Sequence, residues 1–284
     1  MMTAGGLIST SGLAGLIAGS HAPVVLDARS GPDGAGRAQF EAGHIPGARH
    51  TDYAADGWRQ RRDGAPGMLP DAAHLAVLFA RLGLRPDLPV VIAPAGQGAN
   101  DLAAAARIFW TLHHCGHGPL ALLDGGMRAW IDEGRPLEHG PVPTCAGAPL
   151  PVTFRAGVRA TAGETLATLA AGTTMLVDGR AQSYFRGEEK APEARAAGHL
   201  PGAISLDYVR CYDENRHRLK PKDELAQLFS VLPEGAPVIS YCNTGHTAAL
   251  NWFVLSQLLG RGDIRLYDGS MTEWTQDPAR PVAR

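Results

Sequence analysis

The feature that most constrains the fold of this chain is an internal repeat. Four pairs of segments follow one another in the same order in the two halves: VVLDAR and MLVDGR at residues 24–29 and 175–180, GHIPGA and GHLPGA at 43–48 and 198–203, LPVVIA and GAPVIS at 88–93 and 235–240, and LDGGMRAW and YDGSMTEW at 123–130 and 267–274. The order is kept while the spacing between the pairs changes. This is typical of a duplicated domain whose loops differ in length, rather than of a solenoid.

A length of 284 residues agrees with two domains, because each half is long enough to bury its own core. Residues 140–155 are rich in Pro and Gly at their start and show no hydrophobic period, so we predict a linker there. The predicted domains are therefore residues 1–139 and 156–284.

Short apolar runs alternate with longer helical patterns in both halves. Strands are predicted at 24–26, 90–92, 120–123, 175–177, 238–241 and 264–267, and helices at 71–82, 101–112, 222–232 and 248–255. This alternation predicts an α/β fold of two similar domains, each a parallel sheet with helices on both faces.

Composition argues against two classes of partner. The chain has 26 basic and 28 acidic residues, and no basic cluster interleaves with aromatic residues, so we expect no binding to nucleic acid. The N-terminus lacks both a basic segment and a long apolar run, so we expect neither a signal peptide nor membrane contact, and a cytoplasmic location. The four cysteines are widely spaced and form no CxxC pair, which indicates thiols rather than a disulfide framework.

One cysteine is placed for chemistry. Cys242 lies in the segment SYCNTGHT at 240–247, between a strand pattern and an apolar helical pattern. A short loop that enters a helix there directs backbone N–H groups and the helix dipole toward one point, which stabilises a thiolate, the nucleophilic form of cysteine. A free cysteine at a strand end is otherwise a small core residue, but the polar loop after Cys242 argues against that reading. The first half has Pro94 at the equivalent position, so only the second half can carry out thiol chemistry.

The paired GHIPGA and GHLPGA segments, the Cys-x-x-Gly-x-Thr loop and the closing YDGSMTEW resemble the tandem rhodanese-domain sulfurtransferases, from about residue 7 to residue 281. The resemblance implies that Cys242 takes a sulfane sulfur as a persulfide and passes it to cyanide, a small thiol or a thioredoxin-like protein, without a metal or an organic cofactor. It further implies that backbone N–H groups of the loop stabilise the thiolate and the persulfide, namely those of Asn243, Thr244, Gly245, His246 and Thr247. The related Cys-based phosphatases have a longer loop with Arg at the sixth position after the cysteine, where this chain has Ala248, so hydrolysis of phosphate esters is disfavoured.

The sulfur donor is predicted to be 3-mercaptopyruvate or thiosulfate. Members of the family that prefer thiosulfate carry Arg and Lys inside the loop, and this loop has neither. Members that act on mercaptopyruvate carry a hydroxyl two residues after the cysteine, which Thr244 matches, and they suggest His44 and Asp33 as its catalytic partners. The alternative for His44 is that its imidazole braces the GHIPGA turn, and bracing is the expected role of His199 in the second half.

The basic residues that would bind a donor carboxylate depart from the family pattern. Tyr184 stands where mercaptopyruvate enzymes carry Arg. Arg186 is the nearest replacement, and Lys190 and Arg195 are either further replacements or solvated surface charges. Arg180 is a further candidate for donor binding, although we expect it to hold the loop rather than to touch the donor.

Two alternatives to a sulfurtransferase are compatible with the sequence. One is a persulfide carrier in a sulfur relay, which would keep Cys242 but turn over small donors poorly. The other is a non-catalytic interaction module with a rhodanese fold, against which the intact Cys242 loop argues. The HHCGH segment at 113–117 is not predicted to bind metal, because it ends a helix and adjacent side chains rarely converge on one ion. We expect a monomer.

Overall fold

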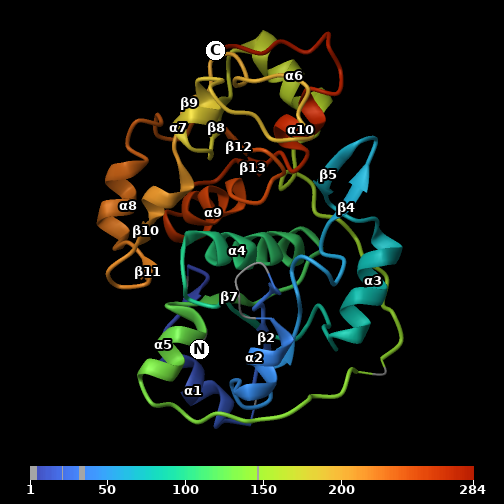
Figure 1. The fold of residues 1–284 in the computed structure, drawn as a ribbon, viewed down its shortest axis with the longest axis vertical. Coiled ribbons are helices and arrows are strands. Elements are labelled where there is room, and N and C mark those ends of the chain that lie inside the picture. The colour runs from blue at the N-terminus through green and yellow to red at the C-terminus, as the bar shows by residue number, and fades with distance from the viewer. Residues whose placement is uncertain (1–4, 21, 32–35, 146) are drawn as a thin grey trace. The chain divides into compact units, whose positions relative to one another are not determined.

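A computed structural model describes residues 5–20, 22–31, 36–145 and 147–284, and the chain forms two compact units (Figure 1). The N-terminal unit contains Met1–Trp58, Pro70–Arg155 and Tyr212–Leu219. The C-terminal unit contains Arg59–Leu69, Ala156–Cys211 and Lys220–Arg284. Each half of the chain therefore contributes one short segment to the unit of the other half.

A five-stranded sheet forms the centre of the N-terminal unit. Its strand order is β1–β7–β6–β2–β3, and every neighbouring pair is parallel. The elements around it are β1 (Leu7–Ile8), α1 (Thr10–Ile17), β2 (Val24–Asp27), α2 (Arg37–Ala42), β3 (Arg49–His50), α3 (Ala72–Arg81), β6 (Val90–Ala93), α4 (Ala99–His114), β7 (Leu120–Leu123) and α5 (Gly126–Asp132).

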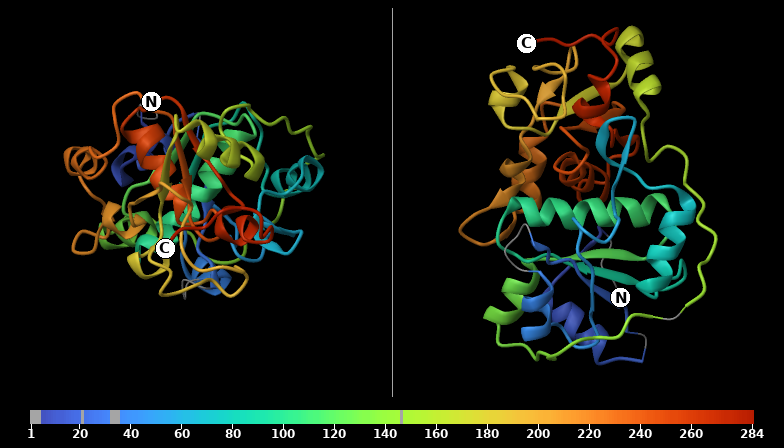
Figure 2. Two further views of the ribbon diagram at one scale, coloured as in Figure 1. Left: turned by 90° about the horizontal axis from the view of Figure 1, so that it is seen from above. Right: turned by 45° about the vertical axis from the view of Figure 1, so that its right-hand side comes forward.

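Helices cover both faces of this sheet (Figure 2). On one face, α4 contacts β6 and β7. On the other face, α1, α2 and α5 share one apolar cluster with the sheet, which includes Leu13, Val25, Phe40, Val91, Ala121 and Trp130. Because both faces are covered, the strands read as continuous apolar runs rather than as alternating ones.

The C-terminal unit repeats this plan with a four-stranded parallel sheet in the order β13–β12–β8–β9. Its elements are α6 (Ala162–Ala171), β8 (Met175–Asp178), α7 (Gln182–Phe185), β9 (Ile204–Ser205), α8 (Lys222–Leu228), β12 (Val238–Tyr241), α9 (Ala248–Phe253), β13 (Ile264–Leu266) and α10 (Ser270–Trp274). A 3-10 turn spans Tyr208–Cys211, and a π-helical turn at Val254–Leu258 continues α9. The predicted α/β fold with two parallel sheets is confirmed.

Element ends deviate from the prediction in a few places. The helix predicted at 222–232 ends at Leu228, and the chain turns ahead of Pro233, a residue that disfavours helical backbone at the position before it. The segment 140–155, predicted as a linker, hydrogen-bonds along the N-terminal unit. The N–H of Cys145 donates to the carbonyl of Arg81 at 3.1 Å, and that of Arg155 to the carbonyl of His114 at 2.7 Å.

The two exchanged segments are β-hairpins. β4 (Gln60–Arg62) pairs with β5 (Ala65–Met68) in the C-terminal unit, and β10 (Tyr212–Asp213) pairs with β11 (Arg218–Leu219) in the N-terminal unit. Both hairpins reach equivalent aspartates of the repeat. The N–H of Leu69 donates to Asp268 at 2.7 Å, and Arg218 lies 3.7 Å from Asp124.

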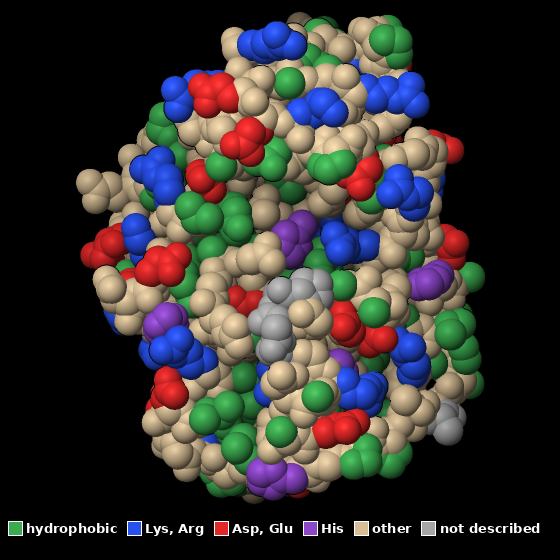
Figure 3. Space-filling model, viewed as in Figure 1, with side chains coloured by type: hydrophobic (Ala, Val, Ile, Leu, Met, Phe, Trp, Pro, Cys, Tyr) green, Lys and Arg blue, Asp and Glu red, His purple; other side chains and the backbone are tan. Residues whose placement is uncertain are grey.

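The surface carries charges of both signs. On the face shown in Figure 3, Lys and Arg side chains are interspersed with Asp and Glu, in agreement with the nearly balanced total of 26 basic and 28 acidic residues. Among the described residues, no helix combines the length and the apolar character needed to cross a membrane.

Candidate active site

Cys242 is the first residue after β12, a strand that is buried along its whole length. The cysteine is 2% exposed, and the loop 242–247 leads directly into α9. This is the strand–loop–helix junction that the sequence predicts, at the carboxyl edge of a parallel sheet, where α/β folds bind their ligands.

The same backbone contact fixes this loop in both units. The N–H of Met271 donates to the carbonyl of Cys242 at 3.1 Å, and in the N-terminal unit the N–H of Met127 donates to the carbonyl of Pro94 at 2.8 Å. Pro94 therefore occupies the structural position of Cys242.

Ser270 anchors the catalytic loop. Its hydroxyl accepts hydrogen bonds from the N–H groups of Cys242 at 3.0 Å and Gly245 at 3.1 Å, and it donates to the carbonyl of Tyr267 at 2.7 Å. The N–H of Gly245 is thus engaged inside the loop, and its predicted part in stabilising the thiolate and the persulfide stays a prediction. Sequence analysis missed Ser270, although one signal was present: YDGSMTEW has Ser where LDGGMRAW has its second Gly.

The backbone of Ser270 is strained. This buried residue has a φ of +50°, in the left-handed region, which costs a non-glycine residue about 1–3 kcal/mol. The equivalent Gly126 has a φ of +60°. Serine therefore occupies a position whose backbone geometry favours glycine.

Arg180 braces the loop from β8. Its guanidinium makes a bidentate pair with Asp178, with Nε–Oδ1 at 2.8 Å and Nη2–Oδ2 at 2.5 Å. It also donates to the carbonyl of Gly198 at 2.8 Å and to Oδ1 of Asn243 at 3.3 Å. These bonds support the loop-holding role for Arg180 rather than direct contact with the donor.

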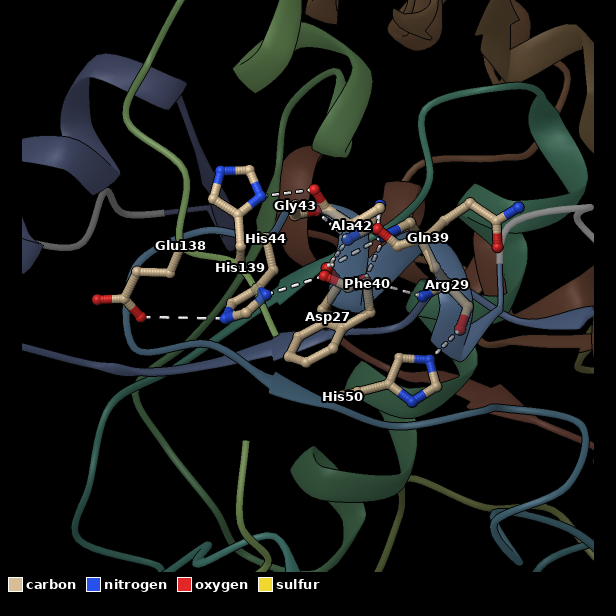
Figure 4. Close-up of polar contacts among 10 residues, drawn as sticks. All are labelled: Asp27, Arg29, Gln39, Phe40, Ala42, Gly43, His44, His50, Glu138 and His139. Atoms are coloured by element: carbon tan, nitrogen blue, oxygen red, sulfur yellow. Dashed lines mark hydrogen bonds and ion pairs between the residues drawn. The ribbon is translucent and has the colours of Figure 1, made fainter. Parts of the chain in front are cut away.

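Figure 4 shows the equivalent arrangement in the N-terminal unit. Arg29 pairs with Asp27 and donates to the carbonyl of Gly43 at 2.8 Å. Beside it, Nδ1 of His44 lies 2.9 Å from the carbonyl oxygen of Phe40, and the two rings stack with centroids 4.0 Å apart. The imidazole of His44 is thus held inside the turn.

His199 makes the same contacts in the C-terminal unit. Its Nδ1 lies 2.7 Å from the carbonyl oxygen of Phe185, and the two rings stack at 3.7 Å. Because His44 and His199 make equivalent contacts to a backbone carbonyl and a phenylalanine ring, the geometry supports bracing of the turn for both. A catalytic role for His44 stays a prediction. Asp33, its predicted partner, lies outside the described residues.

The β4–β5 hairpin packs against the catalytic loop. Gly67 of β5 has a φ of +82°, and a Cβ atom there would lie 2.6 Å from the carbonyl oxygen of Thr244 and 2.7 Å from its Cβ. Only glycine fits this approach without displacing the loop. This contact could not be predicted, because no sequence pattern links the two segments.

The loop of the N-terminal unit contains its own anion. The carboxylate of Asp101 accepts from the backbone N–H groups of Gly96 at 2.5 Å, Gln97 at 3.3 Å and Gly98 at 2.7 Å. Asp101 is 4% exposed and lies in the first turn of α4, where the helix dipole also favours a negative charge. The strand–loop–helix turn of this repeat therefore surrounds a carboxylate with backbone N–H donors.

Asp101→Asn is expected to lower the free energy of unfolding by about 1–3 kcal/mol, because the amide offers one acceptor oxygen in place of two and points N–H donors at N–H donors. Urea unfolding of the full chain measures this change. Asp132→Asn is the matched control, since Asp132 is 66% exposed and its pair with Arg128 at 3.5 Å is a surface ion pair worth little. Equal stability of the two variants would contradict the role given to Asp101.

The predicted carboxylate-binding residues lie in and after α7. Arg186 has a side chain that is 60% exposed and pairs with Glu188 at 3.5 Å, while Tyr184 is half-buried. Lys190 donates to the carbonyl of Ala194 at 2.8 Å. Donor binding by Arg186 and Tyr184 stays a prediction.

The buried cysteines outside the loop have a different environment. Burial raises the pKa of the Cys115 thiol to about 12, and it does the same for Cys211. Both are therefore protonated and unreactive at neutral pH. Tyr208, which the sequence analysis did not select, has its pKa raised first by burial and then by the negative charge of Asp207, so its phenol stays protonated at neutral pH.

Comparison with known proteins agrees with this geometry. The family described as Rhodanese-like domain matches residues 11–133 and 161–277. A protein named "Probable 3-mercaptopyruvate sulfurtransferase" from Pseudomonas aeruginosa is 39% identical over 254 residues, which cover 86% of this chain and 85% of that protein. The thiosulfate sulfurtransferase of the same organism is 34% identical over 248 residues, which cover 86% and 87%.

A relative with a different name and one solved structure complete the comparison. The sulfur carrier protein TtuD of Thermus thermophilus is 31% identical over 257 residues, covering 86% of this chain and 87% of that protein. The crystal structure of the 3-mercaptopyruvate sulfotransferase SseA from Escherichia coli superposes with a TM-score of 0.80 at 26% identity, covering 93% of this chain and 98% of that one. The chain therefore belongs to the rhodanese-like family, of which it carries two domains, and it is a sulfurtransferase of the rhodanese type.

Proposed function

We propose that Cys242 carries sulfur as a persulfide between a small donor and a nucleophilic acceptor. The thiolate donates an electron pair to the outer sulfur of the donor, and a new S–S bond forms. The bond between that sulfur and the rest of the donor breaks with its electron pair, which releases sulfite from thiosulfate or the enolate of pyruvate from 3-mercaptopyruvate. An acceptor, either cyanide or a thiol, then attacks the outer sulfur of the persulfide and regenerates the Cys242 thiolate.

The observation that carries this proposal is the anion held by the equivalent loop. In the N-terminal unit, three consecutive loop N–H groups bind the Asp101 carboxylate. The C-terminal loop follows the equivalent strand and enters the equivalent helix, but it begins with a cysteine sulfur and has Ala249 and Leu250 at the start of α9 instead of a carboxylate. Preorganised N–H groups of this kind stabilise negative charge on the thiolate and on the persulfide, because they need no reorientation during the reaction.

The loop favours 3-mercaptopyruvate over thiosulfate as the donor. Thiosulfate is doubly charged, and the residues from Asn243 to Thr247 include neither Arg nor Lys to hold it. The hydroxyl of Thr244 is suited to donate a proton to the carbonyl oxygen of a keto acid as the enolate forms. Arg186 would bind the donor carboxylate as a bidentate partner.

Loading of the protein with sulfur tests the persulfide. Wild-type protein mixed with 3-mercaptopyruvate, and separately with thiosulfate, is digested without reductant and examined by mass spectrometry. We expect the mass of one additional sulfur atom on the peptide that contains Cys242, with faster loading from 3-mercaptopyruvate. No additional sulfur on that peptide with either donor would exclude the mechanism.

A second candidate function is that of a persulfide carrier, since one relative of similar coverage is named a sulfur carrier protein. A carrier loads Cys242 once and turns over slowly with cyanide or small thiols, whereas an enzyme turns over many times. The two are separated by comparing the fraction of Cys242 that carries sulfur with the steady-state rate of thiocyanate formation. A parallel assay uses a thioredoxin-like protein as the acceptor in place of cyanide.

A further inference from the structure

In the loop of the C-terminal unit, the backbone N–H groups of Cys242 and Gly245 donate to an uncharged side chain, the hydroxyl of Ser270. In the N-terminal unit, the N–H of Gly96 donates to the Asp101 carboxylate. Gly245 is its equivalent, because each of the two glycines lies three residues before its helix and has a positive φ, and in the C-terminal unit the N–H of Gly245 donates instead to the hydroxyl of Ser270. The two repeats therefore tie down the same loop with acceptors of different charge.

The charge of that acceptor bears directly on the sulfur. A carboxylate among the loop N–H groups would take the place of an anionic ligand and would repel a thiolate. The hydroxyl of Ser270 holds the N–H groups of Cys242 and Gly245 without adding negative charge. It leaves the loop able to stabilise an anionic sulfur.

The hydrogen-bonding capacity of the Ser270 hydroxyl is fully used. A serine hydroxyl has one proton to donate and two lone pairs that accept. The proton goes to the carbonyl of Tyr267, and the two lone pairs receive the N–H groups of Cys242 and Gly245. No proton is left to donate to the sulfur, so any contribution of Ser270 is made through the shape of the loop.

The backbone conformation of Ser270 is unusual for a serine. A φ of +50° favours glycine, and the N-terminal repeat has Gly126 there. A Cβ atom on Gly126 would collide with the carbonyl oxygen of Pro94, whereas the C-terminal unit accommodates the serine with its hydroxyl between two loop N–H groups. The other described non-glycine residues with positive φ, Asp63 and His217, lie in hairpin turns.

We propose that Ser270 is a positioning residue for sulfur transfer: its buried, fully bonded hydroxyl holds the Cys242 loop in its anion-binding shape in place of the carboxylate that fills the equivalent loop of the N-terminal unit. This inference rests on the proposed function, because it concerns the same cysteine.

Two substitutions separate positioning from a contribution to stability. Ser270→Gly removes the hydroxyl and relieves the strained φ, so its urea midpoint is expected to stay near that of the wild type. Ser270→Ala removes the hydroxyl and keeps the strain, so its midpoint is expected to fall. Both variants are expected to lose kcat/KM for sulfur transfer by about tenfold or more, because a small displacement of a preorganised group has an effect of that order.

The readout that does not depend on a donor is alkylation of Cys242 by iodoacetamide at a fixed neutral pH, followed by mass spectrometry. We expect both variants to be alkylated at Cys242 about tenfold more slowly than the wild type, since a loosened loop stabilises the thiolate less. Alkylation of Ser270→Gly at the wild-type rate would overturn the proposal. It would also be overturned if the loss of kcat/KM in Ser270→Gly came with a lower urea midpoint that accounts for it. If the wild type fails to load sulfur from any donor, the proposed function falls, while the alkylation rates still test Ser270.

Discussion

Cys242→Ser is expected to abolish sulfur transfer, with kcat/KM reduced by about 10³-fold or more for both 3-mercaptopyruvate and thiosulfate. A serine hydroxyl is protonated at neutral pH and is a poor nucleophile toward sulfur, so it forms no persulfide. We expect the loop to keep its shape. Residue 242 contributes only its backbone N–H and carbonyl to the bonds with the Ser270 hydroxyl and the Met271 N–H, and the substitution leaves both groups in place. Formation of thiocyanate from cyanide measures the loss.

Cys211→Ser is the matched control for this variant. Cys211 lies in the same unit and is fully buried, and burial raises the pKa of its thiol to about 12. Its thiol is a hydrogen-bond donor to Asn251 at 3.6 Å, a bond that serine can replace in kind. We expect activity close to that of the wild type for Cys211→Ser. Equal rates for Cys242→Ser and the wild type would exclude Cys242 as the sulfur carrier.

The fold could be predicted because the sequence patterns that specify it are local and occur in both halves of the chain. Each strand is an apolar run covered on both faces, and each run occurs twice, so the parallel sheets around β2 and β8 follow from the pattern alone. The position of Cys242 could be predicted for the same reason, since a strand, a polar loop and an apolar helix are consecutive in sequence.

The parts of the site that could not be predicted depend on contacts between distant segments. Ser270 lies 28 residues after Cys242. Neither the hydrophobic period nor the composition of residues 59–69 predicts that this hairpin belongs to the C-terminal unit. The GHIPGA motif posed a different problem. The same motif is expected whether its histidine braces a turn or acts in catalysis. The contacts of His44 with the carbonyl and the ring of Phe40 favour bracing, and they are visible only in the structure.

The contact between the hairpin and the loop leads to the second large effect, for Gly67→Ala. A Cβ atom at this position would lie 2.6 Å from the carbonyl oxygen of Thr244, a backbone atom that cannot move without the loop. Because displacement of a reacting group by about 1 Å can cost about 10²-fold in rate, we expect kcat/KM for sulfur transfer to fall by about 10- to 100-fold. Thr244 also carries the hydroxyl proposed to donate a proton, so the defect should be larger with 3-mercaptopyruvate than with thiosulfate.

Gly64→Ala provides the control that isolates this contact. Gly64 lies in the same hairpin with a φ of +83°, so both variants place alanine in a left-handed conformation, at a cost of about 1–2 kcal/mol each. A Cβ atom at Gly64 would meet the side-chain amide of Gln276, with its oxygen at 3.3 Å, which is the end of a side chain rather than backbone. Urea unfolding should therefore show a shared loss of stability, while only Gly67→Ala loses activity. If both variants keep the wild-type kcat/KM, the hairpin does not set the position of Thr244, and if both lose it equally, strain in the hairpin rather than the contact is the cause.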